Sequence, residues 1–455
     1  MGIYVNRVLN MKQIKVIGLD MDHTLVRYHT EKFEELTFNI AIDKLINDKE
    51  YPKCIKDFKF EFNHTIRGLI LDKTNGNLLK VSLYNKIKNT YHGNKALTYK
   101  EQLNIYKSSA IDISDPQYMS IDTAFSIAHT IIFSHLVDLK DKRPELDLPE
   151  YANMADDVTY AVDLAHRDGS IKDVVVKNLD KYIIKDQLSV EVLERFKTYG
   201  KKIWIITNSD YKYTKALLDY CITPYLKQHN TWEDLFEVTI TLASKPKFFT
   251  DKMPLLKVDP KSGMLENYDT KMVPGIYQGG WALKLQADFN ILDREILYLG
   301  DHIYGDIVKL KKACGWRTAL VIEELDREVN AYKSTKDISI EIDKLMEEKI
   351  QIEKTIDELY AKEYEFEEKV EKEIVFKHFD EIEKLDKQLG KLIKSYESNF
   401  NQYWGEVMRA GVEPSFYASQ IERYACIYMS KISDFNLDSP RKYYRPKKRK
   451  IAHEM

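Results

Sequence analysis

Four short apolar runs constrain the fold of this chain more than any other feature. The runs are aliphatic or β-branched and lack the alternation of a half-exposed strand, which is typical of parallel strands covered on both faces. A polar residue follows each run: Asp20 after IKVIGL, Thr207 after KIWII, Ser244 and Lys245 after VTITLA, and Asp301 after EILYLG. A fifth run, RTALVI, ends at Ile322. The runs predict an α/β fold with a doubly wound parallel sheet, in which ligands bind beyond the carboxyl ends of the strands.

The interval between the first two runs indicates an inserted cap domain. Asp20 and Thr207 lie 187 residues apart (207 minus 20), whereas a plain βαβ crossover needs only about 30 residues in total. Within the interval, Asn75-Gly76 separates two apolar runs and predicts a β-hairpin. We assign residues 1–30 and 91–330 to the core and residues 31–90 to the main cap segment. We expect residues 145–175 to reach back to the cap.

The sequence changes character after about residue 330. It becomes rich in Glu and Lys, and apolar residues such as Leu345, Ile352 and Leu359 recur every seven positions. This pattern predicts a helical hairpin within a helical extension over residues 331–430 that packs on the core. We favour packing of the two helices on each other over a subunit interface. We interpret residues 431–455 as a basic tail in solvent rather than a surface for RNA or membrane.

Composition excludes several classes of protein. Lys and Arg number 69 against 72 Asp and Glu, and this balance argues against a nucleic-acid coat protein. No signal peptide and no membrane-spanning run is visible. The cysteines show no zinc-binding spacing and indicate reduced thiols, at Cys54, Cys221, Cys314 and Cys426. We therefore expect a cytoplasmic protein with neither nucleic acid nor membrane as a partner.

Two carboxylates follow the first apolar run in the segment DMDHT. Asp20 and Asp22 are two positions apart at a strand end, so both can face one site. Asp20 would attack phosphorus and form an aspartyl-phosphate. Asp22 would protonate the leaving oxygen and then deprotonate the water that clears the intermediate. Because a DxDxT motif also occurs in ordinary loops, the other strand ends must support this interpretation.

The other strand ends offer groups that suit a phosphate or a metal ion. These are the Thr207 hydroxyl, the Lys245 ammonium and the carboxylates of Asp301 and Asp306. Mg²⁺ prefers oxygen ligands, which Asp20, the Asp22 carbonyl and Asp301 could supply. The cation and Lys245 would offset the charge of a phosphate dianion. Alone, Lys245 would be a surface lysine and Asp306 a helix N-cap, but their combination favours a phosphatase.

The strand-end motifs resemble those of the haloacid dehalogenase superfamily. Longer stretches resemble one of its families, the cytosolic purine 5'-nucleotidases: VNRVLNMKQIKVIGLDMDHTL, RGLILDKTNGNLLKV, AVDLAHRDGSIK, GDHIYGDI, GWRTALVI and FYASQIERYA. The resemblance runs from about residue 4 to about residue 430 and is weakest over residues 340–400. It implies hydrolysis of IMP and GMP with Mg²⁺, and phosphoryl transfer to another nucleoside as a second activity.

The resemblance also implies roles for individual residues. Asp20 corresponds to the nucleophile and Asp22 to the acid/base. Thr207, Asn208 and Lys245 correspond to phosphate-binding positions. Asp20, Asp22 and Asp301 correspond to the metal site, and Asp306 is the second acid of its motif.

A base site follows from the same resemblance. Phe125 corresponds to the family's stacking aromatic, and Asp163, His166 and Lys172 to its substrate loop. A carboxylate at Asp163 could accept the N1–H of hypoxanthine or guanine, which adenine lacks. Without the resemblance, we would interpret Asp163 as a helix cap and His166 as a packed side chain. The family often carries Arg where this chain has Thr159, so the base preference stays open.

The resemblance further implies a nucleotide effector site and a homo-oligomer, either a dimer or a tetramer. The effector positions correspond to Tyr304, Lys312, Arg423 and Tyr424. Asp122 replaces an Asn there and would repel phosphates, which argues against activation by an effector. For Tyr304 and Tyr424 we slightly prefer ordinary packing.

Two other functions remain open on the sequence alone. One is the same phosphatase chemistry on a different phosphomonoester, such as a sugar phosphate. The other is a non-enzymatic scaffold that uses the helical hairpin, although a scaffold would not need the intact acid pair.

Overall fold

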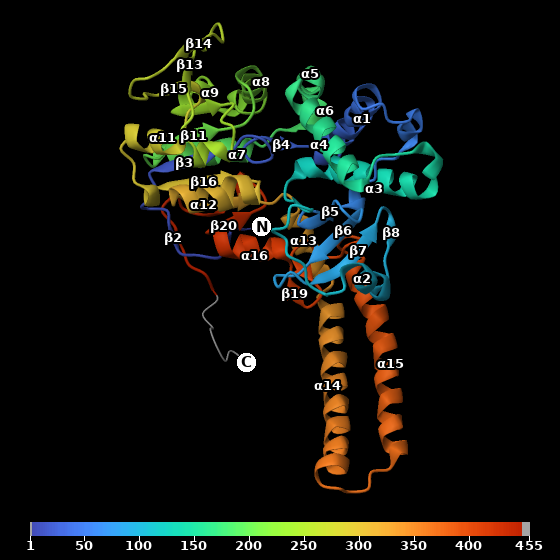
Figure 1. Cartoon of the computed structure of the whole chain (residues 1–455). Coiled ribbons are helices and arrows are strands. Elements are labelled where there is room, and N and C mark those ends of the chain that lie inside the picture. Colours follow the sequence, from blue (N-terminus) through green and yellow to red (C-terminus); the bar gives the residue numbers. More distant parts are fainter. Residues whose placement is uncertain (1, 448–455) are drawn as a thin grey trace. The chain divides into compact units, whose positions relative to one another are not determined.

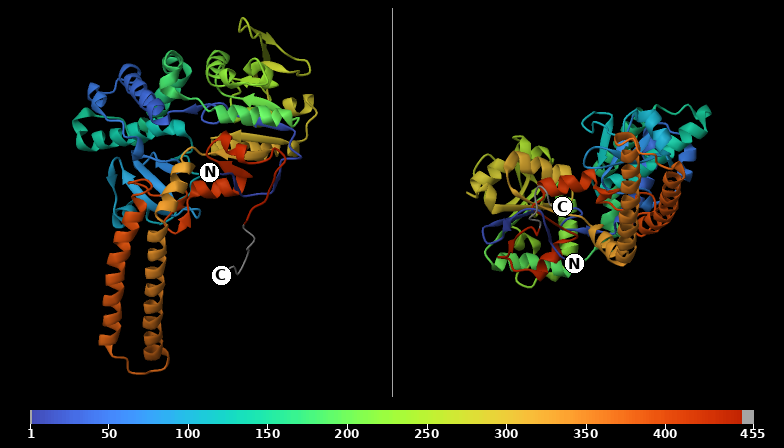
Figure 2. Two further views of the ribbon diagram at one scale, coloured as in Figure 1. Left: turned by 180° about the vertical axis from the view of Figure 1, so that it is seen from behind. Right: turned by 90° about the horizontal axis from the view of Figure 1, so that it is seen from below.

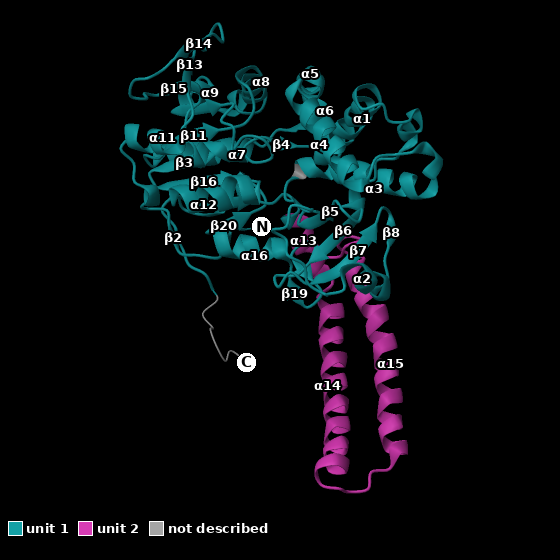
Figure 3. Cartoon of the chain, viewed as in Figure 1, with its two compact units in different colours: residues 1–325, 407–455 teal, residues 326–406 magenta. Residues whose placement is uncertain are grey.

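The structure is a computed structural model, and it describes residues 2–447. The chain forms two compact units (Figure 3). The first unit runs to Leu325 and resumes at Val407, and the second extends from Asp326 to Glu406. Each unit is described by itself below.

A ten-stranded sheet forms the centre of the first unit (Figure 1). Its strands, in spatial order, are β1 (Tyr4–Val5), β20 (Ile427–Met429), β17 (Arg317–Val321), β16 (Ile296–Gly300), β3 (Val16–Leu19), β11 (Lys202–Ile206), β12 (Val238–Thr241), β15 (Gly275–Gly279), β13 (Leu255–Val258) and β14 (Leu265–Asn267). Neighbours from β20 to β15 pair in parallel, whereas β1, β13 and β14 pair antiparallel at the two edges. The four predicted site-bearing strands, β16, β3, β11 and β12, are consecutive neighbours in this sheet.

Helices cover both faces of the sheet. Alternate strand residues belong to two different clusters: Ile17 and Ile203 pack on one face, and Val16 and Trp204 pack on the other. The first cluster includes residues of α7 (Gln187–Thr198), α8 (Tyr211–Cys221) and α9 (Trp232–Leu235), and the second those of α10 (Lys247–Thr250), α11 (Ala282–Asp288) and α12 (Lys309–Cys314). Burial on both faces explains why the runs show no polar alternation. The predicted doubly wound α/β fold is confirmed.

The cap is a second lobe inserted after β3. It contains an antiparallel sheet in the order β8 (Lys95–Ala96), β7 (Ile87–His92), β6 (Asn77–Val81), β5 (Leu69–Asp72) and β9 (Tyr118–Ile121). Its main helices are α1 (Thr30–Asp48), α2 (Tyr99–Tyr106), α3 (Ile127–Lys142), α4 (Tyr151–Arg167) and α5 (Ser170–Lys177). The predicted hairpin joins β5 to β6, with Gly76 in the left-handed conformation at φ 68°. Two short strands, β4 (Arg27–Tyr28) and β10 (Ile183–Ile184), pair where the chain enters and leaves this lobe.

The cap extends beyond the limits drawn from the sequence. Its sheet continues to Ile121, past residue 90. Helix α3 packs against α1 and α4, and its apolar side chains are buried. Residues 145–175, expected to reach the cap, include α4. The complete division of the first unit into core and cap stays a prediction.

The second unit contains the expected helical hairpin. Helices α14 (Lys336–Glu365) and α15 (Lys372–Glu397) lie side by side in both views of Figure 2. Leu345 and Ile356 of α14 and Leu389 of α15 are buried. These residues lie where the two helices contact each other, so the predicted hairpin is present, and α13 (Leu325–Ser334) precedes it; whether it also forms a subunit interface stays open. The predicted helical extension to residue 430 is too long, because β20 (Ile427–Met429) belongs to the ten-stranded sheet.

The interpretation of residues 431–455 as a solvated tail is wrong for their first part. Ile432 and Phe435 are buried in the core cluster, and β21 (Tyr443–Tyr444) pairs with β2 (Leu9–Asn10). These burials depend on contacts with distant parts of the core, which the local sequence does not show. Residues 448–455 lie outside the described part of the chain. Within residues 2–447, the four cysteines are free, and every helix is too short or too polar to cross a membrane.

Candidate active site

The acid pair lies at the carboxyl end of β3. The Asp20 backbone N–H donates to the Leu299 carbonyl (2.8 Å), and the Asp20 side chain is almost fully buried. The Met21 N–H donates to Asp20 Oδ1 (2.7 Å). The Asp22 carboxylate accepts hydrogen bonds from the Tyr28 hydroxyl (2.5 Å) and the Ser209 hydroxyl (2.8 Å). Both carboxylates are therefore held in fixed positions, as a nucleophile and a proton carrier require.

Lys245 reaches the acid pair from the loop after β12. Its Nζ lies 2.7 Å from Asp20 Oδ1 and 2.8 Å from Asp306 Oδ1, and it donates to the Tyr298 hydroxyl (3.1 Å). Burial would lower the pKa of Lys245, but the carboxylates of Asp20 and Asp306 outweigh burial and raise it. Burial also raises the pKa of Asp20, although the neighbouring ammonium acts against that rise. Lys245 therefore stays charged beside the predicted nucleophile.

Thr207 and Asn208 follow β11, the strand beside β3. The Thr207 side chain is buried, and its hydroxyl accepts a hydrogen bond from the Ser209 N–H (3.0 Å). Asn208 exchanges two hydrogen bonds with the Lys245 backbone, one to its carbonyl (3.1 Å) and one from its N–H (2.6 Å). The Asn208 side chain thus holds the loop that carries Lys245. Its predicted contact with phosphate stays a prediction.

Asp301 and Asp306 lie at the end of β16. A π-helical turn (Ile303–Val308) brings Asp306 back towards the strand, where the His302 N–H donates to Asp306 Oδ2 (3.3 Å). A Cβ on Gly300 would lie 2.5 Å from the Asp306 side chain, so this close approach requires glycine. Burial raises the pKa of Asp301 to about 6, although the positive charge of Arg67 acts to lower it.

Three buried carboxylates form an acid cluster that suits a divalent cation. Asp20, Asp301 and Asp306 each offer an oxygen within 4.8 Å of the others. Asp301 Oδ2 is buried without a hydrogen-bond partner among the described residues. Lys245 pairs with Asp20 and Asp306 and so offsets only part of the negative charge of the three carboxylates, and hard oxygen donors favour Mg²⁺. The cluster adds the Asp306 side chain to the predicted ligands, and the predicted role of the Asp22 backbone carbonyl stays a prediction.

A cavity of about 280 Å³ contains most of the predicted base site. Phe125, Asp163 and His166 line it, and so does His302, the residue after Asp301. The other lining residues are Met119, Ser120, Asp122, Thr123, Ser126, His129, Thr159 and Val162. One residue of the cavity wall, His302, is therefore the sequence neighbour of Asp301 in the acid cluster.

The structure changes the sequence prediction for Lys172 and Asp122, and it adds detail for His166. His166 Nε2 is buried without a hydrogen-bond partner in the described part of the chain, and burial, with Lys172, lowers the His166 pKa to about 4. Lys172 is not among the lining residues, because its Nζ lies 2.7 Å from Asp210. Asp122, assigned to the effector region, lines this cavity instead, and burial raises its pKa to about 7.

The predicted effector residues divide into two groups. Lys312 Nζ and the Arg423 guanidinium each lie 5.5 Å from the centre of the Tyr424 ring. Tyr304 is 46% exposed and has Lys309 Nζ 5.0 Å from its ring centre. These contacts are compatible with ordinary packing, and an effector role stays a prediction.

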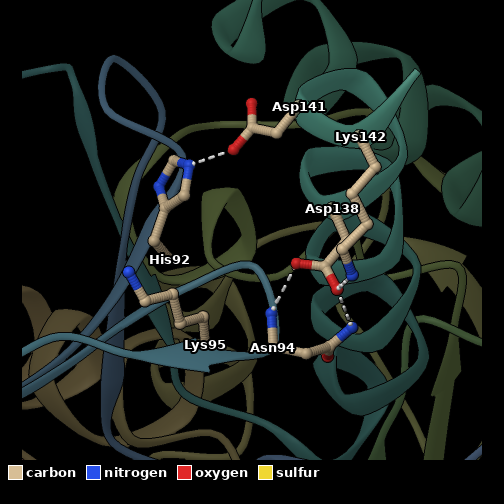
Figure 4. A pocket seen from close by; sticks show the side chains of 6 residues that line it. All are labelled: His92, Asn94, Lys95, Asp138, Asp141 and Lys142. Atoms are coloured by element: carbon tan, nitrogen blue, oxygen red, sulfur yellow. Dashed lines mark hydrogen bonds and ion pairs between the residues drawn. The ribbon is translucent and has the colours of Figure 1, made fainter.

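The cap carries a separate polar cavity of about 340 Å³, which we call the α3 hollow (Figure 4). It is lined by His92, Asn94, Lys95, Asp138, Asp141 and Lys142. His92 Nε2 lies 2.7 Å from Asp141, while Asp138 accepts hydrogen bonds from Asn94 and Lys142. Its charged groups already pair with each other or with neighbours, so we assign it no chemistry.

Sequence reasoning missed Arg67, which precedes β5. Its side chain is 1% exposed, and Nη1 lies 3.9 Å from Asp301 Oδ2. Arg67 begins the matching stretch RGLILDKTNGNLLKV, but nothing within that stretch indicates a contact with Asp301.

Comparison with known proteins decides the family. The model of the 5' nucleotidase family matches residues 3–455. This chain belongs to the 5' nucleotidase family. It is therefore a phosphomonoester hydrolase.

Two relatives show how this 5' nucleotidase compares with other members. It is 27% identical over 442 residues to a 5'-nucleotidase domain-containing protein of Dictyostelium discoideum, covering 95% of this chain and 71% of that one. It is 25% identical over 471 residues to 5'-nucleotidase domain-containing protein 2 of Homo sapiens, and the match covers 100% of this chain and 85% of that one. A predicted phosphoglycolate phosphatase of Haemophilus somnus 129pt is similar in structure at a TM-score of 0.30 and 15% identity, over 68% of this chain and 86% of that one.

Proposed function

We propose that this 5' nucleotidase hydrolyses purine nucleoside 5'-monophosphates, IMP and GMP, with Mg²⁺ and through an aspartyl-phosphate. The observation that carries this proposal is the proximity of an aromatic cavity to the acid cluster. His302 lines the cavity of Phe125, and the adjacent Asp301 belongs to the cluster. A nucleotide with its base beside Phe125 would direct its phosphate towards Asp20.

The first half of the reaction transfers the phosphoryl group to Asp20. Oδ1 of Asp20 is bound by Lys245 and by the Met21 N–H, so Oδ2 is the oxygen left to attack. A bond forms between this oxygen and phosphorus while the bond from phosphorus to the ribose O5' breaks. The electron pair stays on O5', which takes a proton from Asp22. Mg²⁺, when held by Asp20, Asp301 and Asp306, supplies positive charge against the phosphate dianion.

The second half returns the enzyme to its starting state. Asp22, now a carboxylate, takes a proton from water as the water oxygen attacks phosphorus. The bond from phosphorus to Asp20 breaks, and inorganic phosphate leaves. The hydroxyls of Tyr28 and Ser209 hold Asp22 in place for both proton transfers. A nucleoside hydroxyl in place of water would give the phosphotransferase reaction.

Base selection would depend on the polar lining of the cavity. Stacking on an aromatic ring contributes about 1–3 kcal/mol per base but accepts any base. Asp163 could accept the N1–H of hypoxanthine or guanine, and adenine would leave it unpaired. Thr159 already donates to the Ala155 carbonyl (2.8 Å) and contacts His129 Nε2 (3.0 Å). The selectivity for IMP and GMP over AMP would therefore depend on few polar side chains of the cavity lining.

A panel of phosphomonoesters tests this function. Phosphate release would be measured with Mg²⁺ from IMP, GMP, AMP and ribose 5-phosphate, with Asp20→Asn protein as the blank. We expect IMP and GMP to exceed AMP in kcat/KM by at least about tenfold. Strong release from the sugar phosphate with none from purine nucleotides would contradict the proposed substrate. Light scattering on the same sample tests the proposed dimer or tetramer.

A further inference from the structure

Arg67 is a buried cation that approaches the acid cluster from the cap. Its Nη1 donates to the Asp301 carbonyl (3.3 Å), and its Nε donates to Glu324 Oε1 (2.8 Å). Glu324 lies just beyond β17, the neighbour of β16 in the sheet. One guanidinium therefore joins two successive strand ends of the core.

Arg67 makes no hydrogen bond to Oδ2 of Asp301, the carboxylate oxygen that would be available to a cation. The distance from Arg67 Nη1 to Asp301 Oδ2 is 3.9 Å, which is too long for a hydrogen bond. Arg67 thus fixes the backbone of Asp301 without occupying Oδ2, the buried oxygen that has no hydrogen-bond partner. Because Glu324 pairs with the guanidinium, the repulsion between Arg67 and a bound cation is reduced.

The backbone at Arg67 is itself held firmly. Gly68 adopts φ 85°, and a Cβ there would lie 2.5 Å from Tyr417 Cβ. The Gly68 N–H donates to the Ile121 carbonyl (2.7 Å), which ties this point to the cap sheet. The Arg67 side chain therefore extends from an anchored end of β5.

A second contact joins the cap to the same segment of the core. The Thr30 hydroxyl at the start of α1 donates to Glu323 Oε2 (2.6 Å). Glu323 and Glu324 thus each bind one segment of the cap, through Thr30 and through Arg67. Displacement of the cap would act on the Asp301 loop through the Arg67 contact.

We propose that Arg67 is a positioning residue that holds Asp301 for a divalent cation and links cation binding to the position of the cap. This inference rests on the cation site of the proposed function. A residue behind a metal ligand commonly affects metal affinity about 10- to 100-fold. Arginine suits this position because its planar fork reaches the Asp301 carbonyl and Glu324 together, which a lysine ammonium would not do.

Calorimetric titration of the substrate-free protein with Mg²⁺ alone tests the proposal. We expect Arg67→Gln and Arg67→Lys to weaken Mg²⁺ binding about tenfold or more. The matched control is Arg27→Gln, because Arg27 also lies where the chain enters the cap but pairs with Asp186 (3.7 Å). The control should bind Mg²⁺ within about twofold of the unmodified protein, since its partner is not one of the cluster carboxylates.

Turnover measurements give a second readout. The Mg²⁺ concentration for half-maximal activity should rise in both Arg67 variants, whereas KM for the nucleotide at saturating Mg²⁺ should stay within about twofold, because Arg67 does not line the cavity. Circular dichroism would establish that each variant is folded. If neither Arg67 variant folds, Glu324→Gln removes the partner charge and should itself weaken Mg²⁺ binding.

The outcomes separate the two proposals. Folded Arg67 variants that bind Mg²⁺ as tightly as the unmodified protein would overturn the positioning role and leave the proposed function standing. Tighter binding would also overturn it, because it would mean that Arg67 acts only as a repelling charge. Unaltered binding by Glu324→Gln, when the Arg67 variants do not fold, would overturn it too. An unmodified protein that binds no Mg²⁺ would overturn both proposals.

Discussion

The acid cluster and the α3 hollow both contain several charged side chains, but these side chains are paired differently in the two regions. In the α3 hollow, carboxylates alternate with cations and amides, and pairs such as His92 with Asp141 are partly exposed. In the acid cluster, Asp20, Asp301 and Asp306 meet while buried around the single ammonium of Lys245, and Asp301 Oδ2 has no hydrogen-bond partner among residues 2–447. Buried like charges are costly unless a ligand compensates for them. The comparison teaches that a buried excess of one sign of charge, rather than the number of charged groups, marks a site for chemistry.

Asp20→Asn should produce the largest difference between the two regions. An amide cannot form the aspartyl-phosphate, so turnover of IMP should fall at least about a thousandfold. Asp141→Asn in the α3 hollow makes the same chemical change and should leave turnover within about twofold. Phosphate release by the two purified variants measures the contrast. Near-normal turnover by Asp20→Asn would mean that the nucleophile is another residue.

Mg²⁺ should stabilise the acid cluster and not the hollow. A ligand at one hundred times its Kd stabilises the native state by about 2.7 kcal/mol. We expect added Mg²⁺ to raise the melting temperature of the unmodified protein and of His92→Ala, but not of Asp301→Asn, which lacks a full ligand charge. EDTA should abolish turnover. The same Mg²⁺-dependent rise in Asp301→Asn would show that the cation binds elsewhere.

Phe125→Leu tests whether the cavity beside the cluster binds the base. Loss of stacking worth about 1–3 kcal/mol should lower kcat/KM for IMP by about 5- to 150-fold. Phe376→Leu, at an exposed position of the second unit, is the matched control and should have no effect. Equal rates for Phe125→Leu and the control would place the base outside this cavity.

The smallest effect should come from the α3 hollow. Its His92–Asp141 pair is partly exposed, and such pairs contribute about 0–1 kcal/mol to stability. His92→Ala should therefore reduce the free energy of unfolding by about 1 kcal/mol or less and leave kcat unchanged. Chemical denaturation and phosphate release on one preparation measure both quantities. A large loss of kcat would mean that the hollow supports catalysis after all.

The sequence predicted the convergence at the sheet edge because parallel strands place their carboxyl ends on one side. Asp20, Lys245 and Asp301 are far apart in sequence, yet each follows a strand, and the strand order was enough to bring them together. The hairpin at Gly76 and the two long helices were equally local predictions. In each case the signal was a repeating pattern or a turn residue within a short segment.

What the sequence did not predict depends on contacts between distant segments. Arg67 reaches Asp301 only because the cap sheet begins beside that strand end. Lys172 belongs to a matching stretch but pairs with Asp210, which follows β11. The burial of Ile432 and Phe435 near the C-terminus depends on the core around them. Local patterns do not encode such partners.

Acid-quenched intact mass spectrometry tests the central claim most directly, namely that Asp20 becomes phosphorylated during turnover. Protein mixed with IMP and Mg²⁺ would be quenched during turnover, and its mass compared with that of Asp20→Asn treated identically. We predict a fraction of the unmodified protein heavier by one phosphoryl group, with the added mass on the peptide that contains Asp20, and none on the variant. Phosphate release without any phosphorylated protein, or phosphorylation of a different residue, would contradict the account.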